Sequence, residues 1–230
     1  MTRTGSGYAR AALAATGALV LLAGCTKGTS TGDRLFAVVR GQLLGGEEAA
    51  PAPQPTRAQL DQIPAATIGF SFGDIDPVYM VALADNGGYV TYQDKGRRGV
   101  VLKGGAIAGT LGLGDDLYAV KHAQDDPIAN RTPVAEWPAQ VVRSYEYRVR
   151  DLDDYVITVS CELELLGYTQ YEIVEVELGV AKVRERCSNA VREFENTYWA
   201  DLTGFVWASE QWMGPDLEPA TIEVVRPYGG

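Results

Sequence analysis

Three cysteines and one histidine are the residues of this 230-residue sequence best suited to covalent or metal chemistry. A thiolate can be acylated, can form a disulfide or can bind a metal ion, whereas a catalytic serine or cysteine relay needs a histidine beside its nucleophile. Cys25 lies near the N-terminus, far from Cys161 and Cys187. The surroundings of each cysteine therefore indicate which chemistry applies to it.

The residues Leu22-Ala23-Gly24-Cys25 look like a bacterial lipobox, in which the thiol receives a diacylglyceryl group and the chain is then cut before the cysteine. Two arginines and an uncharged apolar run from Ala11 to Ala23 precede them, as in a secretory signal. A helix over this run would span only ~20 Å, too short to stay across a membrane. We expect residues 1–24 to be a lipoprotein signal peptide and Cys25 to carry lipid. The alternative is an ordinary signal peptide with a free cysteine.

The expected lipid anchor sets the location of the protein. Two or three acyl chains hold a protein stably on a bilayer. Thr26 follows the cysteine, and in enterobacterial lipoproteins a residue other than aspartate there favours export to the outer membrane. Removing 24 of 230 residues leaves 206, with 18 basic and 30 acidic side chains and a net charge of −12. We expect attachment to the periplasmic face of the outer membrane, and this charge excludes nucleic acid as a partner.

Cys161 and Cys187 form an even pair once Cys25 is lipidated, and in an oxidising envelope compartment we expect them to form a disulfide. Period-two alternation places each thiol on the apolar face of a predicted strand, so that both point inward. Two buried free thiols are the main alternative. A metal site is less favoured because no histidine or third cysteine lies near either position.

The remaining candidates for chemistry are weaker. His122 ends a strand-like run and is expected to be structural or solvated. The glycines of 109–114 resemble a phosphate loop, but no helix and no Walker lysine follow, so turns explain them better. The aspartates at 115–116, 125–126 and 151–154 lack the spacing of a calcium loop. We predict no catalytic residue, metal or cofactor, although thirty acidic residues leave a glycoside-cleaving carboxylate pair open.

Aromatic residues near the C-terminus could contact a sugar or a protein. Tyr198, Trp199 and Trp212 are the candidate contacts, because aromatic faces stack on sugar rings. Packing in the core or in an interface is the competing interpretation for each ring. Trp207 shares a strand face with Phe205, and we expect it to be buried.

The elements that position these residues follow a tether. Residues 25–55 contain the lipidated N-terminus and a Pro/Ala-rich stretch that cannot supply a core. Within it, Asp33 could cap a short helix with apolar residues from Leu35 to Leu44, or the stretch could be a partly ordered linker. Thr56 is expected to cap a second short helix and to open a single β domain over residues 56–230.

Short β-branched and aromatic runs dominate the domain. An Asn-Gly pair at Asn86 predicts a hairpin, and Val78 to Ala84, apolar on both faces, predicts a central strand. A slip in alternation between Ile173 and Val174 predicts a bulge. The expected strands are 66–72, 78–84, 89–92, 100–103, 141–149, 154–165, 169–178, 181–187, 192–199, 205–212 and 221–225. About ten or more strands predict an all-β, antiparallel barrel-like or sandwich fold.

Several segments, taken in order, resemble the YjbF/GfcB (YmcC-like) lipoprotein family of exopolysaccharide and group-four capsule loci. The residues that carry the resemblance are Gln62–Ile68, Val78–Ala82, Thr110–Leu113, Leu117–Val120, Asp126-Pro127, Asn196–Trp199, Ser209–Gln211 and Gly214-Pro215. The resemblance implies a barrel-like β fold and an accessory role in producing or exporting polysaccharide with companion periplasmic and outer-membrane proteins. It implies no catalytic residue. The Pro-rich tether and the Cys161/Cys187 pair depart from the family pattern.

Three functions remain in view. A non-catalytic assembly subunit of a polysaccharide exporter is favoured, and it should expose an apolar patch or a free sheet edge. A periplasmic glycan-binding module should show an aromatic-lined groove. A carbohydrate-active enzyme should show a cleft with paired carboxylates of perturbed pKa.

Overall fold

The structure, a computed structural model, describes residues 54–73, 76–147 and 155–229. The predicted signal peptide, Cys25 and the tether as far as Pro53, with its first helix, lie outside the described residues, as do Asp151, Asp153 and Asp154. The residues from Gln54 onward form one unit. In the described part of the chain, no helix has both the length and the apolar character needed to cross a membrane.

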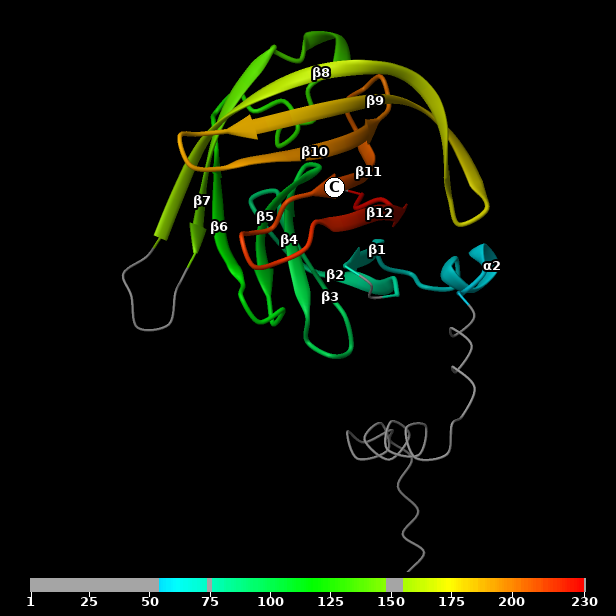
Figure 1. The fold of residues 1–230 in the computed structure, drawn as a ribbon. Helices are drawn as coiled ribbons and strands as arrows, with labels where there is room; N and C mark the ends of the chain where they lie inside the picture. The colour runs from blue at the N-terminus through cyan, green and yellow to red at the C-terminus, as the bar shows by residue number, and fades with distance from the viewer. Residues whose placement is uncertain (1–53, 74–75, 148–154, 230) are drawn as a thin grey trace, which may run out of the picture. The chain divides into compact units, whose positions relative to one another are not determined.

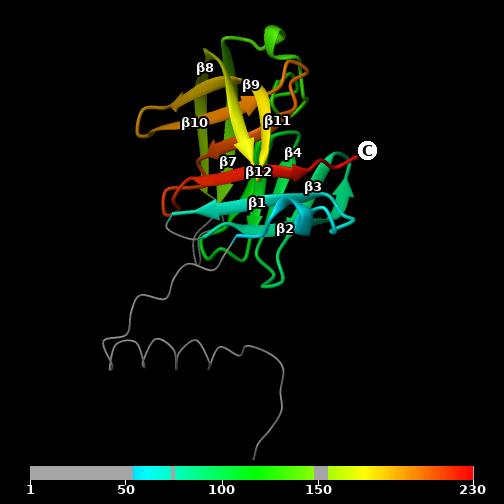
Figure 2. The same ribbon diagram turned by 90° about the vertical axis from the view of Figure 1, so that its right-hand side faces the viewer.

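Twelve strands form one antiparallel sheet in the order β5-β4-β3-β2-β1-β12-β11-β10-β9-β8-β7-β6 (Figure 1). Their bounds are β1 Thr67–Phe72, β2 Val78–Asn86, β3 Tyr89–Gln93, β4 Gly99–Lys103, β5 Ala106–Leu111, β6 Leu117–His122, β7 Gln140–Tyr147, β8 Tyr155–Ile173, β9 Val176–Ser188, β10 Glu193–Ala200, β11 Val206–Gln211 and β12 Ala220–Arg226. The two end strands meet, since a Cβ atom on Gly109 of β5 would lie 3.2 Å from the carbonyl oxygen of Tyr118 in β6. The sheet thus curls into a nearly closed barrel (Figure 2), and the predicted all-β class is confirmed.

Local signals for the second helix and the first hairpin are confirmed. Thr56 caps the short helix α2, Arg57–Leu60, through a capping box in which Gln59 bonds back to the Thr56 backbone at 2.8 Å. The chain reverses between β2 and β3 at Gly87 and Gly88, which have φ values of 64° and 86°. Both positions need the left-handed conformation that glycine adopts without strain.

The predicted bulge at Ile173 is wrong, because the chain turns there. Ile173 and Val176 face each other across a two-residue turn whose residues, Val174 and Glu175, have φ values of 42° and 67°. The slip in alternation therefore marks the end of β8. The register shift lies instead between Leu165 and Gly167, where a break between strands was expected, so β8 continues as one strand of 19 residues.

The barrel interior holds the main hydrophobic core. Alternate residues of each strand point inward, as in β7, where Val141, Tyr145 and Tyr147 are buried. Val78–Ala84 lies in β2, between β1 and β3, which agrees with the predicted central position. Its inward residue Met80 is fully buried, whereas its outward residues stay partly exposed.

The connection from β6 to β7, residues 123–139, packs into the barrel and is called the plug loop here. Ile128 and Val134 of this loop are buried in a cluster with Tyr198 and Val206. Two glycines make room for its backbone: a Cβ atom on Gly104 would lie 2.3 Å from the Ile128 carbonyl oxygen, and one on Gly204 only 1.9 Å from that of Thr132. Both have positive φ values, so a side chain is disfavoured by conformation as well as by space.

The outer half of the β8–β9 hairpin is called the arm and comprises Leu163–Ile173 and Val176–Val180. It extends past the end of β7 and bends over the outside of the barrel toward α2 (Figure 1). Its residues Ile173 and Val180 are buried against Trp199 and Leu60 in a cluster separate from the barrel core. The Tyr171 hydroxyl also donates to a carboxylate oxygen of Glu223 in β12 at 3.0 Å.

Candidate partner-binding surface

An open groove lies on the outside of the barrel, between α2 and the strands β2 and β3. Its volume is about 490 Å³, and its lining residues are Pro55, Gln59, Leu60, Ile63, Tyr79, Val81, Leu83, Gln93, Asp94 and Lys95. The name α2 groove is used for this surface. Its floor consists of the outward residues of β2, which are apolar although they face solvent. Charged or polar residues are usual at such positions.

Neighbouring contacts fix the walls of the α2 groove. Leu60 is 4% exposed and anchors α2 in the outer cluster, while Arg226 of β12 donates to the Asp61 carbonyl oxygen at 2.9 Å. Opposite, Asp94 holds the turn after β3 through an ion pair of 2.7 Å with Arg98. The groove is therefore formed before any partner binds, which lowers the entropic cost of binding.

The chemistry of the α2 groove suits binding. Leu83 is 60% exposed, and Tyr79 and Val81 are half-buried beside it. The pKa of Tyr79 is raised by burial and then by the nearby Glu223, so its hydroxyl stays protonated and can donate a hydrogen bond. Exposed apolar side chains that line a preformed groove are suited to docking apolar side chains of a partner.

A group of charged side chains lies inside the barrel, where sequence reasoning placed none. Arg143 of β7 contacts Asp126 of the plug loop at 2.7 Å and Glu185 of β9 at 2.5 Å, and all three are at most 2% exposed. The Tyr198 hydroxyl donates to Glu185 at 2.9 Å, and Asn196 donates to the same oxygen at 2.7 Å. The group is called the buried ion cluster.

Electrostatics hold the buried ion cluster in its charged form. Burial alone would lower the pKa of Arg143, but Glu185, Tyr198 and Asp126 raise it well above the usual value. Burial likewise acts to raise the pKa of Asp126, but the charge of Arg143, its hydrogen bond to the carboxylate and the hydrogen bond from the Ala129 backbone together lower that pKa. Two carboxylates bridged by one guanidinium and covered by protein are suited to fixing the plug loop.

The three aromatic candidates lie mainly in the core. Tyr198 is 0%, Trp199 7% and Trp212 8% exposed. Trp212 stacks on Phe194 with ring centroids 4.1 Å apart, and Trp199 packs on Tyr171 at 4.8 Å. Little of any of these rings is open to a sugar, which favours the packing interpretation for all three.

Sequence reasoning missed a second, smaller aromatic pocket at one end of the barrel. Trp207, expected to be buried, is half-buried, and its indole nitrogen donates to Asp201 at 3.0 Å. It shares a narrow pocket with Phe205, Tyr92 and Tyr228, and Arg131 of the plug loop lies over the Phe205 ring at 5.1 Å. The alternation of β11 was misleading because the register shift between β10 and β11 falls at Trp207, which has no pairing partner between Val206 and Ala208.

The other candidates are explained by local structure. Asp116 accepts hydrogen bonds from the backbone of Gly112 and Leu113 at 2.7 and 3.0 Å, so residues 112–114 of the Gly-rich segment form a turn, as expected, whereas residues 109–111 belong to β5. Cys161 and Cys187 face each other in β8 and β9 and form a disulfide. Glu185 lies within 4.8 Å of both sulfur atoms, a neighbour that sequence reasoning missed, but its oxygens already accept from Arg143, Asn196 and Tyr198.

His122 ends β6 as expected, and its burial predicts a pH effect on stability. Burial, followed by the positive charge of Arg143, lowers the pKa of His122 from 6.5 to about 4. Between these values the unfolded chain binds a proton that the folded chain does not, so stability falls as pH falls. We expect the free energy of unfolding in urea to drop by about 2 kcal/mol from pH 7 to pH 5. The drop should be much smaller in His122→Gln, and an equal drop in both proteins would contradict this role.

The family profile described as "Group 4 capsule polysaccharide lipoprotein gfcB, YjbF" matches residues 32–225. The chain belongs to the YjbF family. A solved YjbF-like fold, the hypothetical lipoprotein YmcC from Escherichia coli K12, aligns with a TM-score of 0.66 at 17% identity, covering 89% of this chain and 100% of that one. No curated protein matches the chain.

Membership of the YjbF family places the protein among lipoproteins linked to capsule polysaccharide and associates it with the cell envelope. Several residues of the segments that resemble the YjbF family make buried polar contacts in this structure. Asp126 belongs to the buried ion cluster, Asn196 accepts from the Trp212 backbone at 2.7 Å, and Gln211 accepts from the Ile107 backbone at 2.9 Å. The first contact joins the plug loop to β7, and the other two join residues of the barrel wall that are 16 and 104 positions apart in the sequence.

Proposed function

We propose that this YjbF-family chain is a non-catalytic, membrane-anchored assembly subunit in the production and export of a capsule-type polysaccharide. The observation that carries the proposal is the α2 groove, an exposed apolar surface on the outside of a barrel whose interior is filled by a packed core and a plug loop. An assembly subunit needs such an outer surface to hold another protein. Companion periplasmic and outer-membrane proteins of the same locus are the proposed partners.

The anchor completes the proposal. Acylation of Cys25 would hold the domain on the periplasmic face of the outer membrane, and Pro55, which lines the α2 groove, is where the chain enters the domain from its N-terminal segment. Mass spectrometry of the mature protein should find an acylated Cys25 as its first residue. An unmodified thiol with the leader still attached would contradict the anchor.

The proposal is tested by placing a charge in the α2 groove. Leu83→Asp should reduce crosslinking to neighbouring envelope proteins by about tenfold and lower surface polysaccharide, because a buried carboxylate opposes apolar docking. The matched control is Leu202→Asp, since Leu202 is 68% exposed in the turn between β10 and β11, outside the groove. Circular dichroism should show both variants folded. Normal crosslinking and polysaccharide in Leu83→Asp would remove the support for an assembly role.

Glycan binding remains the second candidate function, at a site other than the one expected. Trp207, Phe205 and Tyr228 lie beside Arg131 around an opening of only about 20 Å³, so an acidic sugar would contact these groups from outside and would not enter the pocket. The Leu83→Asp variant separates assembly from glycan binding. A glycan site at Trp207 lies outside the α2 groove, so glycan binding there would be unaffected by the added charge.

A further inference from the structure

The arm leaves one edge of β8 without a neighbouring strand. β7 pairs with β8 only as far as Glu162, and the Leu163 backbone N–H then bonds to the Ala139 carbonyl at 2.9 Å. From there to Ile173, β8 pairs with β9 alone. Such an edge presents unpaired backbone donors and acceptors to any extended chain that comes alongside.

The turn at the end of the arm shows which groups are free. In a two-residue turn with two positive φ values, the flanking residues Ile173 and Val176 form a hydrogen-bonded pair, and every second pair along the ladder does the same. The backbone groups of Tyr168, Gln170 and Glu172 therefore point away from β9. One of them, the Gln170 carbonyl, accepts only a local bond of 3.2 Å from the Thr169 hydroxyl.

The side chains of this edge do not block strand pairing. Proteins protect exposed edges with lysine, proline or inward charges, yet residues 165–171 contain no charged residue and no proline. Leu165, Leu166 and Tyr168 are 49%, 44% and 67% exposed. The register shift at Leu165 is the one protective feature in this stretch, and it leaves the edge from Tyr168 to Glu172 regular.

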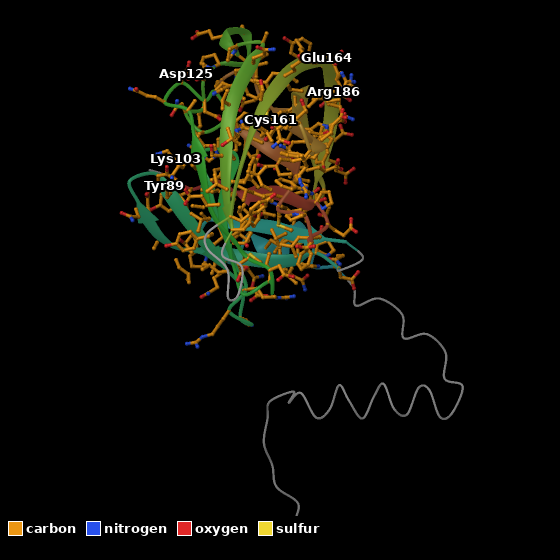
Figure 3. All side chains as sticks on the ribbon, turned by 60° about the vertical axis from the view of Figure 1, so that its left-hand side comes forward. Tyr89, Lys103, Asp125, Cys161, Glu164 and Arg186 are labelled. Carbon is orange, nitrogen blue, oxygen red and sulfur yellow. A yellow bond between two sulfur atoms is a disulfide. The ribbon has the colours of Figure 1, made fainter. Side chains whose placement is uncertain are left out.

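Charge selects the kind of chain that fits. Glu172 and Glu177 face each other directly across the arm, and Glu175 lies at its tip, all of them exposed. Within the described residues, none of the three has a salt bridge, whereas Glu164 at the other end is paired with Arg184 and with Arg186, which is labelled next to it in Figure 3. Like charges placed opposite each other destabilise a ladder, so basic side chains beside the tip would relieve this repulsion.

We propose that the free edge of β8 binds an extended segment of a partner protein by strand addition, with lysine or arginine side chains of that segment beside Glu172, Glu175 and Glu177. A second copy of this chain fits less well because its mature net charge of −12 would oppose association. The proposal deepens the assembly role proposed above by naming the class of partner, but it concerns a different surface.

The test uses the purified mature lipoprotein and a synthetic probe. The probe is a peptide of about ten residues in which threonine and valine alternate, with two lysines at each end. We expect measurable binding that weakens with salt and that falls about tenfold or more in Gln170→Pro. Proline at this position removes an outward N–H and leaves the ladder to β9 intact. The matched control, Gln170→Thr, keeps the N–H and should bind like the wild type.

Two further peptides test the mechanism without altering the protein. The first carries methyl groups on alternate backbone nitrogens and should lose binding, and the second has glutamates in place of the lysines and should bind more weakly. Equal binding by Gln170→Pro and the wild type, or no binding of the lysine peptide, would overturn the proposal. Self-association abolished by Gln170→Pro would also overturn it, by assigning the edge to a second copy. The peptide-binding result is independent of the α2 groove experiment, because it concerns the β8 edge of the purified protein and measures neither crosslinking in the envelope nor polysaccharide.

Discussion

Arg143→Ala is expected to lower the free energy of unfolding by about 3–5 kcal/mol. The substitution leaves Asp126 and Glu185 buried at 0% exposure without the guanidinium that contacts them at 2.7 and 2.5 Å. Breaking a buried ion pair on one side costs far more than the pair contributes, because each remaining carboxylate keeps only neutral hydrogen-bond donors and has no opposite charge and no water. Urea unfolding at pH 7, followed by tryptophan fluorescence, measures the change.

Two variants show whether the loss comes from uncompensated charge. Arg184→Ala removes a half-buried arginine from its pair with the exposed Glu164 and should change stability far less, since ion pairs open to solvent are weak. Arg143→Met combined with Asp126→Asn and Glu185→Gln removes all three charges at similar volume and should recover much of the stability. A value for Arg143→Ala close to that of Arg184→Ala would show that the buried ion cluster does not hold the plug loop.

Capping residues, turn residues and period-two alternation predicted most of the helices and strands. Errors arose where the residue types favoured one local structure and the barrel imposed another. Thr56 and Asn86 carry their own capping and turn chemistry, so their elements were predictable. Val174 and Glu175 form a tight turn although a β-branched residue disfavours positive φ, and nothing in the residue types announced it. β5 was missed because its small residues read as part of a Gly-rich loop, whereas the barrel core selects them.

The candidate sites were harder to predict than the fold because they depend on contacts between distant segments. The α2 groove joins Leu60 to Leu83, and the buried ion cluster joins residues 126, 143 and 185. A signal for the cluster did exist: Glu185 lies between Val183 and Cys187 on the inward face of β9. A charge at an inward position indicates a buried partner, but the alternation alone does not say which one.

Removing the disulfide is the second change with a large expected effect. Cys161→Ala combined with Cys187→Ala should lower the free energy of unfolding by about 3 kcal/mol, because the bond closes a loop with a sequence separation of 26 and restricts the unfolded chain. The bond also joins the strands that carry the inner end of the arm and Glu185. Both sulfur atoms are fully buried, so part of the loss comes from side-chain packing. Chemical denaturation with and without a reducing agent measures the effect.

Single substitutions distinguish a disulfide from two buried free thiols. If the bond exists, either Cys161→Ala or Cys187→Ala alone breaks it, so each single variant should lose nearly as much stability as the double variant. Free thiols contribute separately, and their losses would then add. A reducing agent should destabilise the wild type but leave the double variant unchanged. Additive single losses together with no effect of reduction would be incompatible with the bond, and the arm would then be held to the barrel by strand pairing and packing alone.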